Sequence, residues 1–175
     1  MFLNPHKNLL NVGLSESMAV ADFGAGSGHY TFAASGMVGN SGHVYAIDAS
    51  RDLLNKILKE SKINRIGNIH IIWADLEKEK ATGLKDESID LAIIANTLYQ
   101  VGRKDRVAEE VKRVLRKKGR LFVVEWADKI AGIGPHSKHL VKKEHAISLF
   151  KKEGFILDRE VESGDHHYGL LFRKN

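Results

Sequence analysis

The chain of 175 residues has no cysteine, few aromatic residues and no long apolar run. The absence of cysteine excludes disulfide bonds, thiolate metal sites and cysteine nucleophiles. No apolar run approaches the roughly 20 residues that a membrane-spanning helix needs. The first residues also lack the apolar core and cleavage site of a signal peptide, so we expect a cytoplasmic protein.

Positive charge is in modest excess, because lysine and arginine outnumber aspartate and glutamate and give a formal net charge of +5. The basic residues gather in four short clusters, which are Lys112–Arg113, Arg116–Lys118, Lys142–Lys143 and Lys151–Lys152. Most of them fall opposite an apolar stripe, so we interpret them as solvated helix faces. Attraction to an anionic partner such as RNA is the alternative. Aromatic residues amount to 7% and are not interleaved with these clusters, so a stacking platform for nucleic acid is not favoured.

Strand-like and helix-like segments alternate along the chain. Strands are expected over residues 18–22, 44–48, 69–73, 89–95, 121–126, 155–162 and 167–173. A first helix is expected over 28–37, and a second begins after the capping residue Ser50 and buries Leu53, Leu54, Ile57 and Leu58. A third runs from Val107 and ends at Gly119. A fourth contains Ile147 and Phe150 and ends at Gly154.

This alternation predicts an α/β fold with a doubly wound, Rossmann-like sheet. The sheet would be mostly parallel and seven-stranded, and its last two strands would form a C-terminal antiparallel hairpin. The length fits a single domain over residues 1–175.

Two further segments frame that domain. Residues 1–17 form a short N-terminal segment, in which Asn4 and Gly13 bound a predicted helix over 5–12. Its apolar residues Leu9, Leu10 and Val12 are expected to face the domain. Residues 127–140 lack periodicity and follow a strand at a carboxyl end, where such sheets bind ligands, so they are the predicted lid loop.

The glycine-rich turn within Asp22–Gly28 carries the most chemistry. A strand precedes it, and a second strand ends in Asp48 about 20 residues later, where an acid can accept hydrogen bonds from ribose hydroxyls. A dinucleotide motif would need glycine where His29 stands, which disfavours a nicotinamide dehydrogenase. A carboxylate before the first glycine would repel a pyrophosphate but suit an α-ammonium group. A ligand with ribose, adenine and an amino-acid end is S-adenosylmethionine.

The turn resembles the first motif of class I S-adenosylmethionine-dependent methyltransferases. Nearly the whole chain is similar to small type-11 methyltransferases related to the ubiquinone/menaquinone-biosynthesis group. The matching segments are VADFGAGSGHY (20–30), GHVYAID (42–48), SIDLAIIANTLYQ (88–100), VKRVLRKKGRL (111–121) and EGF (153–155).

The resemblance implies a site for the methionine part of the cofactor. Gly24, Gly26 and Gly28 would line it, with Asp22 near the ammonium group. Asn96 would lie beside the methionine and the transferring methyl group, although it could also be a strand-end turn residue.

The resemblance also implies a site for the nucleoside. Asp48 would hold the ribose and Ala49 would pack on adenine. Asp75 would accept from the adenine amino group, with the Leu76 backbone amide on the ring nitrogen. Asp75 could instead be a loop carboxylate or a helix cap.

Catalytic residues are less constrained, because methyl transfer from a sulfonium needs alignment and exclusion of water more than acid–base chemistry. Tyr99, His136 and His167 are the candidates, the histidines as general bases or as polar groups that shape the cleft. Further candidates at the same end of the sheet are Glu125, Asp128, His139 and Tyr168. No metal is expected, although His136, His139 and one of His166 or His167 could form a histidine site. His166 and His167 cannot both enter one pocket, because neighbouring strand residues face opposite sides.

The sequence therefore predicts an S-adenosylmethionine-dependent methyltransferase that acts on a small organic acceptor and releases S-adenosylhomocysteine. The alternatives are methylation of RNA or protein, and a cofactor-binding module without catalysis. The expected partner is a small molecule, with no membrane span, in a monomer or homodimer.

Overall fold

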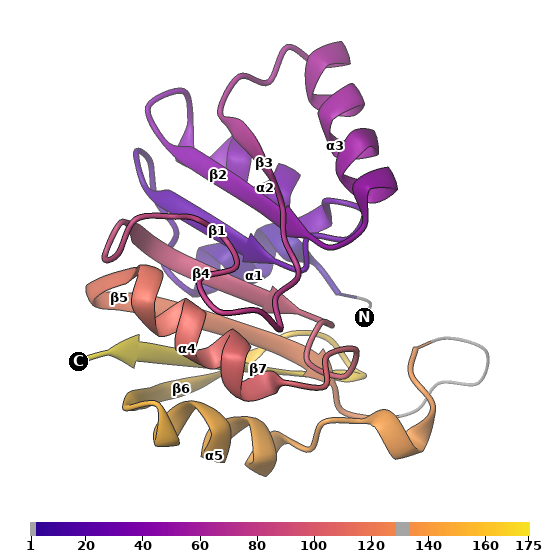
Figure 1. The fold of residues 1–175 in the computed structure, drawn as a ribbon, viewed down its shortest axis with the longest axis vertical. Coiled ribbons are helices and arrows are strands. Elements are labelled where there is room, and N and C mark those ends of the chain that lie inside the picture. The colour runs from indigo at the N-terminus through magenta and orange to yellow at the C-terminus, as the bar shows by residue number, and fades with distance from the viewer. Residues whose placement is uncertain (1–2, 129–133) are drawn as a thin grey trace.

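The computed structural model describes residues 3–128 and 134–175 of the chain (Figure 1). Within these residues one mixed sheet of seven strands has the order β3-β2-β1-β4-β5-β7-β6. The strands are β1 (Ala19–Phe23), β2 (His43–Asp48), β3 (Ile69–Trp73), β4 (Ile89–Ala95), β5 (Leu115–Trp126), β6 (Phe155–Glu162) and β7 (His167–Lys174). β7 runs antiparallel to both β5 and β6, while the other neighbours are parallel. The predicted doubly wound sheet with a C-terminal hairpin is confirmed.

Helices cover both faces of this sheet. They are α1 (Pro5–Asn11), α2 (His29–Val38), α3 (Arg51–Ile63), α4 (Lys104–Val114), α5 (Lys143–Lys152) and the 3₁₀ turn η1 (Ser137–His139). The buried residues of α1, α2 and α3 join clusters on one face of the sheet, and those of α4 and α5 join the cluster on the other. In Figure 1, α4 and α5 lie in front of the sheet and α1 lies behind it. No helix in the described ranges is long and apolar enough to cross a bilayer.

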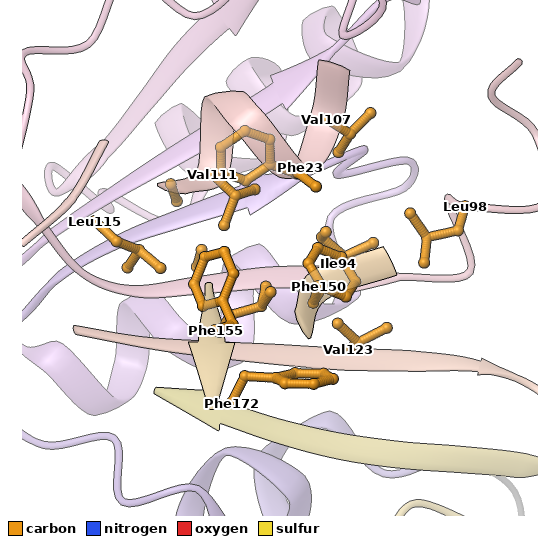
Figure 2. Packing of buried hydrophobic residues seen from close by; sticks show 14 of the residues in the cluster. Phe23, Ile94, Leu98, Val107, Val111, Leu115, Val123, Phe150, Phe155 and Phe172 are labelled. Atoms are coloured by element: carbon orange, nitrogen blue, oxygen red, sulfur yellow. The ribbon is translucent and has the colours of Figure 1, made fainter. Parts of the chain in front are cut away.

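The central strand β4 forms the middle of the core, because six of its seven residues are buried. A continuous apolar run of this kind is typical of a strand covered on both faces. On the α4–α5 face, Phe150 packs against Phe155 and Phe172 with ring centroids 5.9 and 5.3 Å apart (Figure 2). This packing joins α5 to the β5–β7–β6 part of the sheet.

The helix α4 ends earlier than the sequence predicts, because it stops at Val114 and not at Gly119. Leu115 is already extended, with φ −67° and ψ 132°, and pairs with Ile89 at the start of a longer β5. The chain then bulges before regular pairing resumes, with Lys118 at φ +62°. The spacing of apolar residues predicts a helix that includes Leu115. In the structure Leu115 is buried as part of a strand.

The N-terminal helix is correctly predicted, and two of the three residues expected to face the domain do so. Leu9 and Val12 are fully buried, whereas Leu10 is 56% exposed. Asn8 is buried instead, and its side-chain amide donates to the Tyr30 hydroxyl at 2.8 Å. A polar side chain can be buried when it has a hydrogen-bond partner, and the spacing of apolar residues does not reveal such a partner.

In α3 the capping role of Ser50 is confirmed, because its hydroxyl accepts from the Leu53 amide. Of the four residues expected to be buried there, Leu54 and Ile57 are buried while Leu53 and Leu58 are only partly so.

Candidate functional site

The glycine turn between β1 and α2 opens onto a cleft with a volume of about 910 Å³ at the carboxyl ends of the parallel strands. Gly24 and Gly26 line this cleft with φ of +80° and +54°. A Cβ atom on Gly24 would lie 2.3 Å from the Thr97 hydroxyl oxygen, so a side chain there would need Thr97 to move. Only glycine combines this backbone conformation with this close approach.

Gly28 has a different place from the one expected, because it does not line the cleft. It caps α2 at φ +86°, and a Cβ atom there would lie 2.9 Å from Ile57 and 3.0 Å from Phe32. The structure therefore gives Gly28 a role in helix packing.

Asp22 lies in the wall of the cleft beneath the turn, and only 1% of it is exposed. Its carboxylate accepts a hydrogen bond from the Thr31 hydroxyl at 2.6 Å. Burial raises the pKa of Asp22 to about 6, and the nearby charge of Asp48 acts in the same direction. A cation bound next to this carboxylate would favour its ionised form and lower that pKa.

Asp48 ends β2 and joins the glycine turn to the start of α3. One carboxylate oxygen accepts from the Gly26 amide at 2.9 Å and the other from the Ser50 amide at 2.8 Å. Each oxygen of an ionised carboxylate has two lone pairs, so both retain the capacity to accept from a ligand. Asp48 thus fixes the shape of the turn while lining the cleft.

The residues expected at the nucleoside end also line the cleft. Asp75 and Leu76 follow β3, and Asp75 accepts from the Glu77 amide at 3.1 Å. The Ala49 carbonyl accepts from the Trp73 indole nitrogen at 2.9 Å, which holds the loop after β2 in place.

At the opposite end of the cleft, Asn96 and His167 meet across 71 positions of sequence. The Asn96 side-chain nitrogen lies 3.2 Å from the His167 Nε2 atom. With the amide nitrogen facing the ring, the amide donates and Nε2 accepts, an arrangement that corresponds to a neutral histidine with its proton on Nδ1. The His167 ring also packs on Trp126, with centroids 4.2 Å apart.

The charge state of His167 differs from that of a typical histidine base. Burial lowers its pKa to about 4, and the neighbouring His166 adds to this effect. A base with so low a pKa is weak at neutral pH, so His167 is better suited to orient a ligand by hydrogen bonding than to remove a proton.

Of the other catalytic candidates, Tyr99 lies in the cleft and His136 does not. Tyr99 lines the cleft, and burial followed by the charge of Glu125 raises its pKa. His136 is exposed and does not line the cleft. His166 lies 2.8 Å from Asp128 and does not line the cleft, so only one of the two adjacent histidines enters it.

The remaining candidates lie outside the cleft. Tyr168 is buried and donates its hydroxyl to the Val141 carbonyl. His139 is exposed at the end of the short turn η1. The described residues contain no cluster of three potential metal ligands.

The predicted lid loop lies only partly within the described residues, because 129–133 fall outside them. Its described part includes Gly134, which lines the cleft at φ +81°. A Cβ atom there would lie 3.0 Å from the Trp126 ring. This loop therefore approaches the cleft next to Trp126 and His167.

Sequence reasoning missed Thr97 and Trp126, which both line the cleft. Thr97 donates its hydroxyl to the Phe23 carbonyl at 3.1 Å, so it connects the end of β4 to the glycine turn. Trp126 could have been found as the last residue of a strand that ends at this edge. Nothing in its local sequence indicates that it stacks on His167.

The cleft is acidic although the chain carries a net positive charge. Its charged carboxylic residues are Asp22, Asp48, Asp75 and Glu77, and among the described lining residues there is no lysine or arginine. The basic clusters of the sequence therefore lie elsewhere on the surface.

Comparison with known proteins agrees with this arrangement. The model of a methyltransferase domain family matches residues 14–165. A ubiquinone/menaquinone biosynthesis C-methyltransferase from Vibrio campbellii is 31% identical over 152 residues, which cover 86% of this chain and 56% of that protein. The chain thus spans little more than half the length of this curated relative.

Two solved structures have the same fold. A SAM-dependent methyltransferase from Aquifex aeolicus superposes with a TM-score of 0.91 at 26% identity, covering 99% of this chain and 91% of that one. A protein described as a putative type 11 methyltransferase from Sulfolobus solfataricus gives 0.81 at 22% identity, covering 100% and 95%. Because the family model matches residues 14–165, which are most of the chain, the chain belongs to the methyltransferase domain family. Within it, the chain is a class I S-adenosylmethionine-dependent methyltransferase of the type-11 group.

Proposed function

We propose that the chain transfers the methyl group of S-adenosylmethionine to a small, uncharged organic acceptor. The observation that carries this proposal is the glycine turn in the wall of the cleft beside the buried Asp22 carboxylate. Among the described atoms, a Cβ atom on Gly26 would meet only the Gly24 carbonyl oxygen, at 4.0 Å, so the backbone there is open to a ligand, and the carboxylate suits a positively charged amino-acid end. A pyrophosphate at the same place would meet two carboxylates, Asp22 and Asp48.

The residues in the cleft fit this cofactor in chemical type. Asp22 would hold the ammonium group, Asp48 the ribose hydroxyls, and Asp75 with the Leu76 amide the adenine edge, while Ala49 would pack on its ring. S-adenosylmethionine, when bound, supplies an activated methyl group on a positively charged sulfur. The chain then needs to orient the acceptor and exclude bulk water from the sulfonium, and a neutral acceptor must also lose a proton to solvent as its bond to the methyl group forms.

The acceptor end is walled by Tyr99, Trp126 and His167, and Asn96 lies next to them. Aromatic side chains of this kind pack on flat rings. In the tautomer with the proton on Nδ1, His167 would have a donor left for an oxygen of the acceptor. The Vibrio campbellii relative is named for C-methylation in ubiquinone and menaquinone biosynthesis. We therefore propose a quinol-like aromatic ring as the acceptor class.

Tyr99 and His167 are the residues that we propose to contact the acceptor. His136 was a third candidate, but its exposed side chain lies outside the cleft, so the proposal does not use it. Asn96 would orient His167 through the bond at 3.2 Å.

Methylation of RNA is the second candidate function, and the acidic cleft argues against it. A nucleic-acid strand entering the cleft would bring phosphates towards Asp75 and Glu77 without a lysine or arginine among the described lining residues. A binding module without catalysis would keep the cofactor residues, so only an activity measurement separates it from an enzyme.

Calorimetry with S-adenosylmethionine, S-adenosylhomocysteine and NAD tests the cofactor. We expect the first two to bind in roughly the micromolar range and NAD not to bind. Asp48→Ala should weaken binding, whereas Asp52→Ala, which removes an exposed carboxylate nearby in α3, should not. Binding of NAD in preference to S-adenosylhomocysteine would refute the assignment.

A transfer screen with a labelled methyl group tests the acceptor. Purified protein would be incubated with a metabolite extract and, separately, with RNA and protein pools. Label in an uncharged aromatic product supports the proposal, label in RNA supports the alternative, and cofactor binding with no transfer to any pool supports the non-catalytic module.

A further inference from the structure

Glu125 is a buried carboxylate next to the cleft that the cofactor and acceptor do not use. It is the next-to-last residue of β5, and only 1% of it is exposed. Its Oε1 atom accepts two hydrogen bonds from consecutive backbone amides, those of Thr97 at 2.8 Å and Leu98 at 2.6 Å. Its Oε2 atom is buried and has no hydrogen-bond partner among the described residues.

The turn that Glu125 holds touches both ends of the cleft. Asn96 adopts φ +55°, which is uncommon for a residue with a side chain, and it faces His167 at the acceptor end. Thr97 packs against Gly24 at the cofactor end. One carboxylate oxygen therefore fixes a segment on which both proposed binding regions depend.

A neutral hydrogen-bond acceptor could satisfy the same two amides. A carboxylate is stronger, because hydrogen bonds to an ionised acceptor are about twice as strong as neutral ones. Leaving such a group buried with one unpartnered oxygen is unfavourable, and an apolar residue of similar size would avoid that penalty. The position of the carboxylate is thus explained by the turn and not by packing.

We propose that Glu125 is a positioning residue, which holds the turn after β4 in the conformation that the methyl-transfer site needs. This inference rests on the proposed function for its role in the reaction, but the contact itself is independent of it. Because the two amide bonds are strongest when Glu125 is ionised, protonation of this residue loosens the turn.

Burial places that protonation near neutral pH. The pKa of Glu125 is raised to about 7 by burial, which outweighs the two backbone bonds and the charge of Lys104. The groups that face Glu125 from the turn and from β7 are Tyr99 and Tyr168, and the charge of Glu125 contributes to raising the pKa of each. The carboxyl group loses its charge as pH falls through about 7, so the turn is held most firmly above that pH.

Three variants separate positioning from general stability. Glu125→Gln keeps an oxygen that can accept both amide bonds but removes the charge, and Glu125→Leu removes both. Glu110→Gln is the matched control, because Glu110 is also buried and accepts from a backbone amide, that of Thr82 at 3.0 Å, far from the cleft. Burial acts to raise the pKa of Glu110, but its bonds with Arg113 and Thr82 outweigh this and lower it.

The first measurement follows the carboxyl carbons of glutamate by ¹³C NMR from pH 5 to 9. One signal should titrate near pH 7, vanish in Glu125→Gln and persist in Glu110→Gln. Hydrogen exchange at the Thr97 and Leu98 amides, corrected for intrinsic rates, should be slower above this midpoint than below it by roughly threefold. Exchange at these amides that does not follow the Glu125 titration would overturn the proposal.

The second measurement is the affinity for S-adenosylhomocysteine. Glu125→Leu should bind about tenfold more weakly, Glu125→Gln should recover most of that loss, and Glu110→Gln should bind like the original chain. A folded Glu125→Leu protein with unchanged affinity would refute the positioning role. If no variant and not even the original chain binds, the proposed function fails, while the exchange measurement still decides whether Glu125 holds the turn.

Discussion

Alanine in place of Gly24 would disturb the closest approach between the glycine turn and the end of β4. The backbone at this position has φ +80°, and an L-residue pays roughly 1–2 kcal/mol to adopt the left-handed region. The new Cβ atom would lie 2.3 Å from Oγ1 and 2.5 Å from Cγ2 of Thr97, so Thr97 must shift. Overpacking of this kind costs about 1–3 kcal/mol. We expect the free energy of unfolding to fall by about 2–5 kcal/mol in total.

The matched control is Gly36→Ala in α2. Gly36 has no positive φ, and a Cβ atom there would meet nothing within 4 Å. Alanine is the better helix former, so this variant should be more stable by about 0.5–1 kcal/mol. The two substitutions make the same chemical change and should have opposite effects.

A double-mutant cycle with Thr97→Ala separates overpacking from backbone strain. Removing Oγ1 and Cγ2 leaves only the Thr97 Cβ atom, 3.0 Å from the new side chain. The cycle should therefore show a favourable coupling of about 1–3 kcal/mol, while the strain from the positive φ remains.

Urea unfolding gives these free energies, provided that the slope with denaturant is unchanged, and calorimetry with S-adenosylhomocysteine gives the affinity. We expect Gly24→Ala to bind more weakly even under conditions where it is fully folded. A Gly24→Ala protein within about 0.5 kcal/mol of the original, or a coupling near zero, would refute the reasoning.

Three further predictions concern charge and burial. For Asp22, the folded pKa of about 6 lies above the unfolded value of 3.8, so the free energy of unfolding should fall as pH rises through this window. Urea unfolding at pH 8 should therefore show Asp22→Asn to be more stable than the original chain, by up to about 3 kcal/mol. The same variant should lose binding of S-adenosylhomocysteine. For His167, the folded pKa of about 4 lies below the unfolded value of 6.5, so the free energy of unfolding should fall as pH drops from about 6.5 towards 4. The loss should be about 1–2 kcal/mol, because solvent screens the charge of this half-buried group. His167→Gln should abolish that part of the pH dependence. Leu9→Ala should destabilise the chain by about 2–5 kcal/mol and Leu10→Ala by less than about 1 kcal/mol, because the first is fully buried and the second is 56% exposed; equal losses in thermal or urea unfolding would contradict the assigned face of α1.

Local chemistry determined much of the fold in advance. The nearly continuous apolar run Ile89–Ala95, interrupted by Asp90, predicts a central strand, and β4 has these bounds. Asn4 and Ser50 cap their helices as expected, because each side-chain oxygen accepts a backbone amide within one turn. The positive φ of Gly24 follows from a turn that joins a strand to a helix.

The cofactor end of the candidate site was also largely predictable. Of the nine residues expected to bind the cofactor, all except Gly28 line the cleft. Each ends a strand, follows one or belongs to the glycine turn, and strand ends meet at one edge of a parallel sheet. Whether these residues bind the cofactor stays a prediction that calorimetry can test.

The acceptor end depended on contacts that only the tertiary structure makes. β5 and β7 become neighbours through the order of the sheet, which brings Trp126 against His167 and Asn96 within 3.2 Å of the same ring. The sequence named His167 as a candidate base, but its surroundings lower its pKa to about 4. A pKa depends on burial and on neighbours from other elements, which no local pattern specifies.

The sequence by itself determined the order of strands and helices, the glycine turn and the acids at the strand ends, because each follows from residues close together in the chain. The tertiary structure decided which face of α1 is buried, where α4 gives way to β5, and that Glu125 holds the turn at Thr97. Those outcomes depend on which distant atoms come into contact after the sheet has formed, and burial then sets the strength of each hydrogen bond and charge.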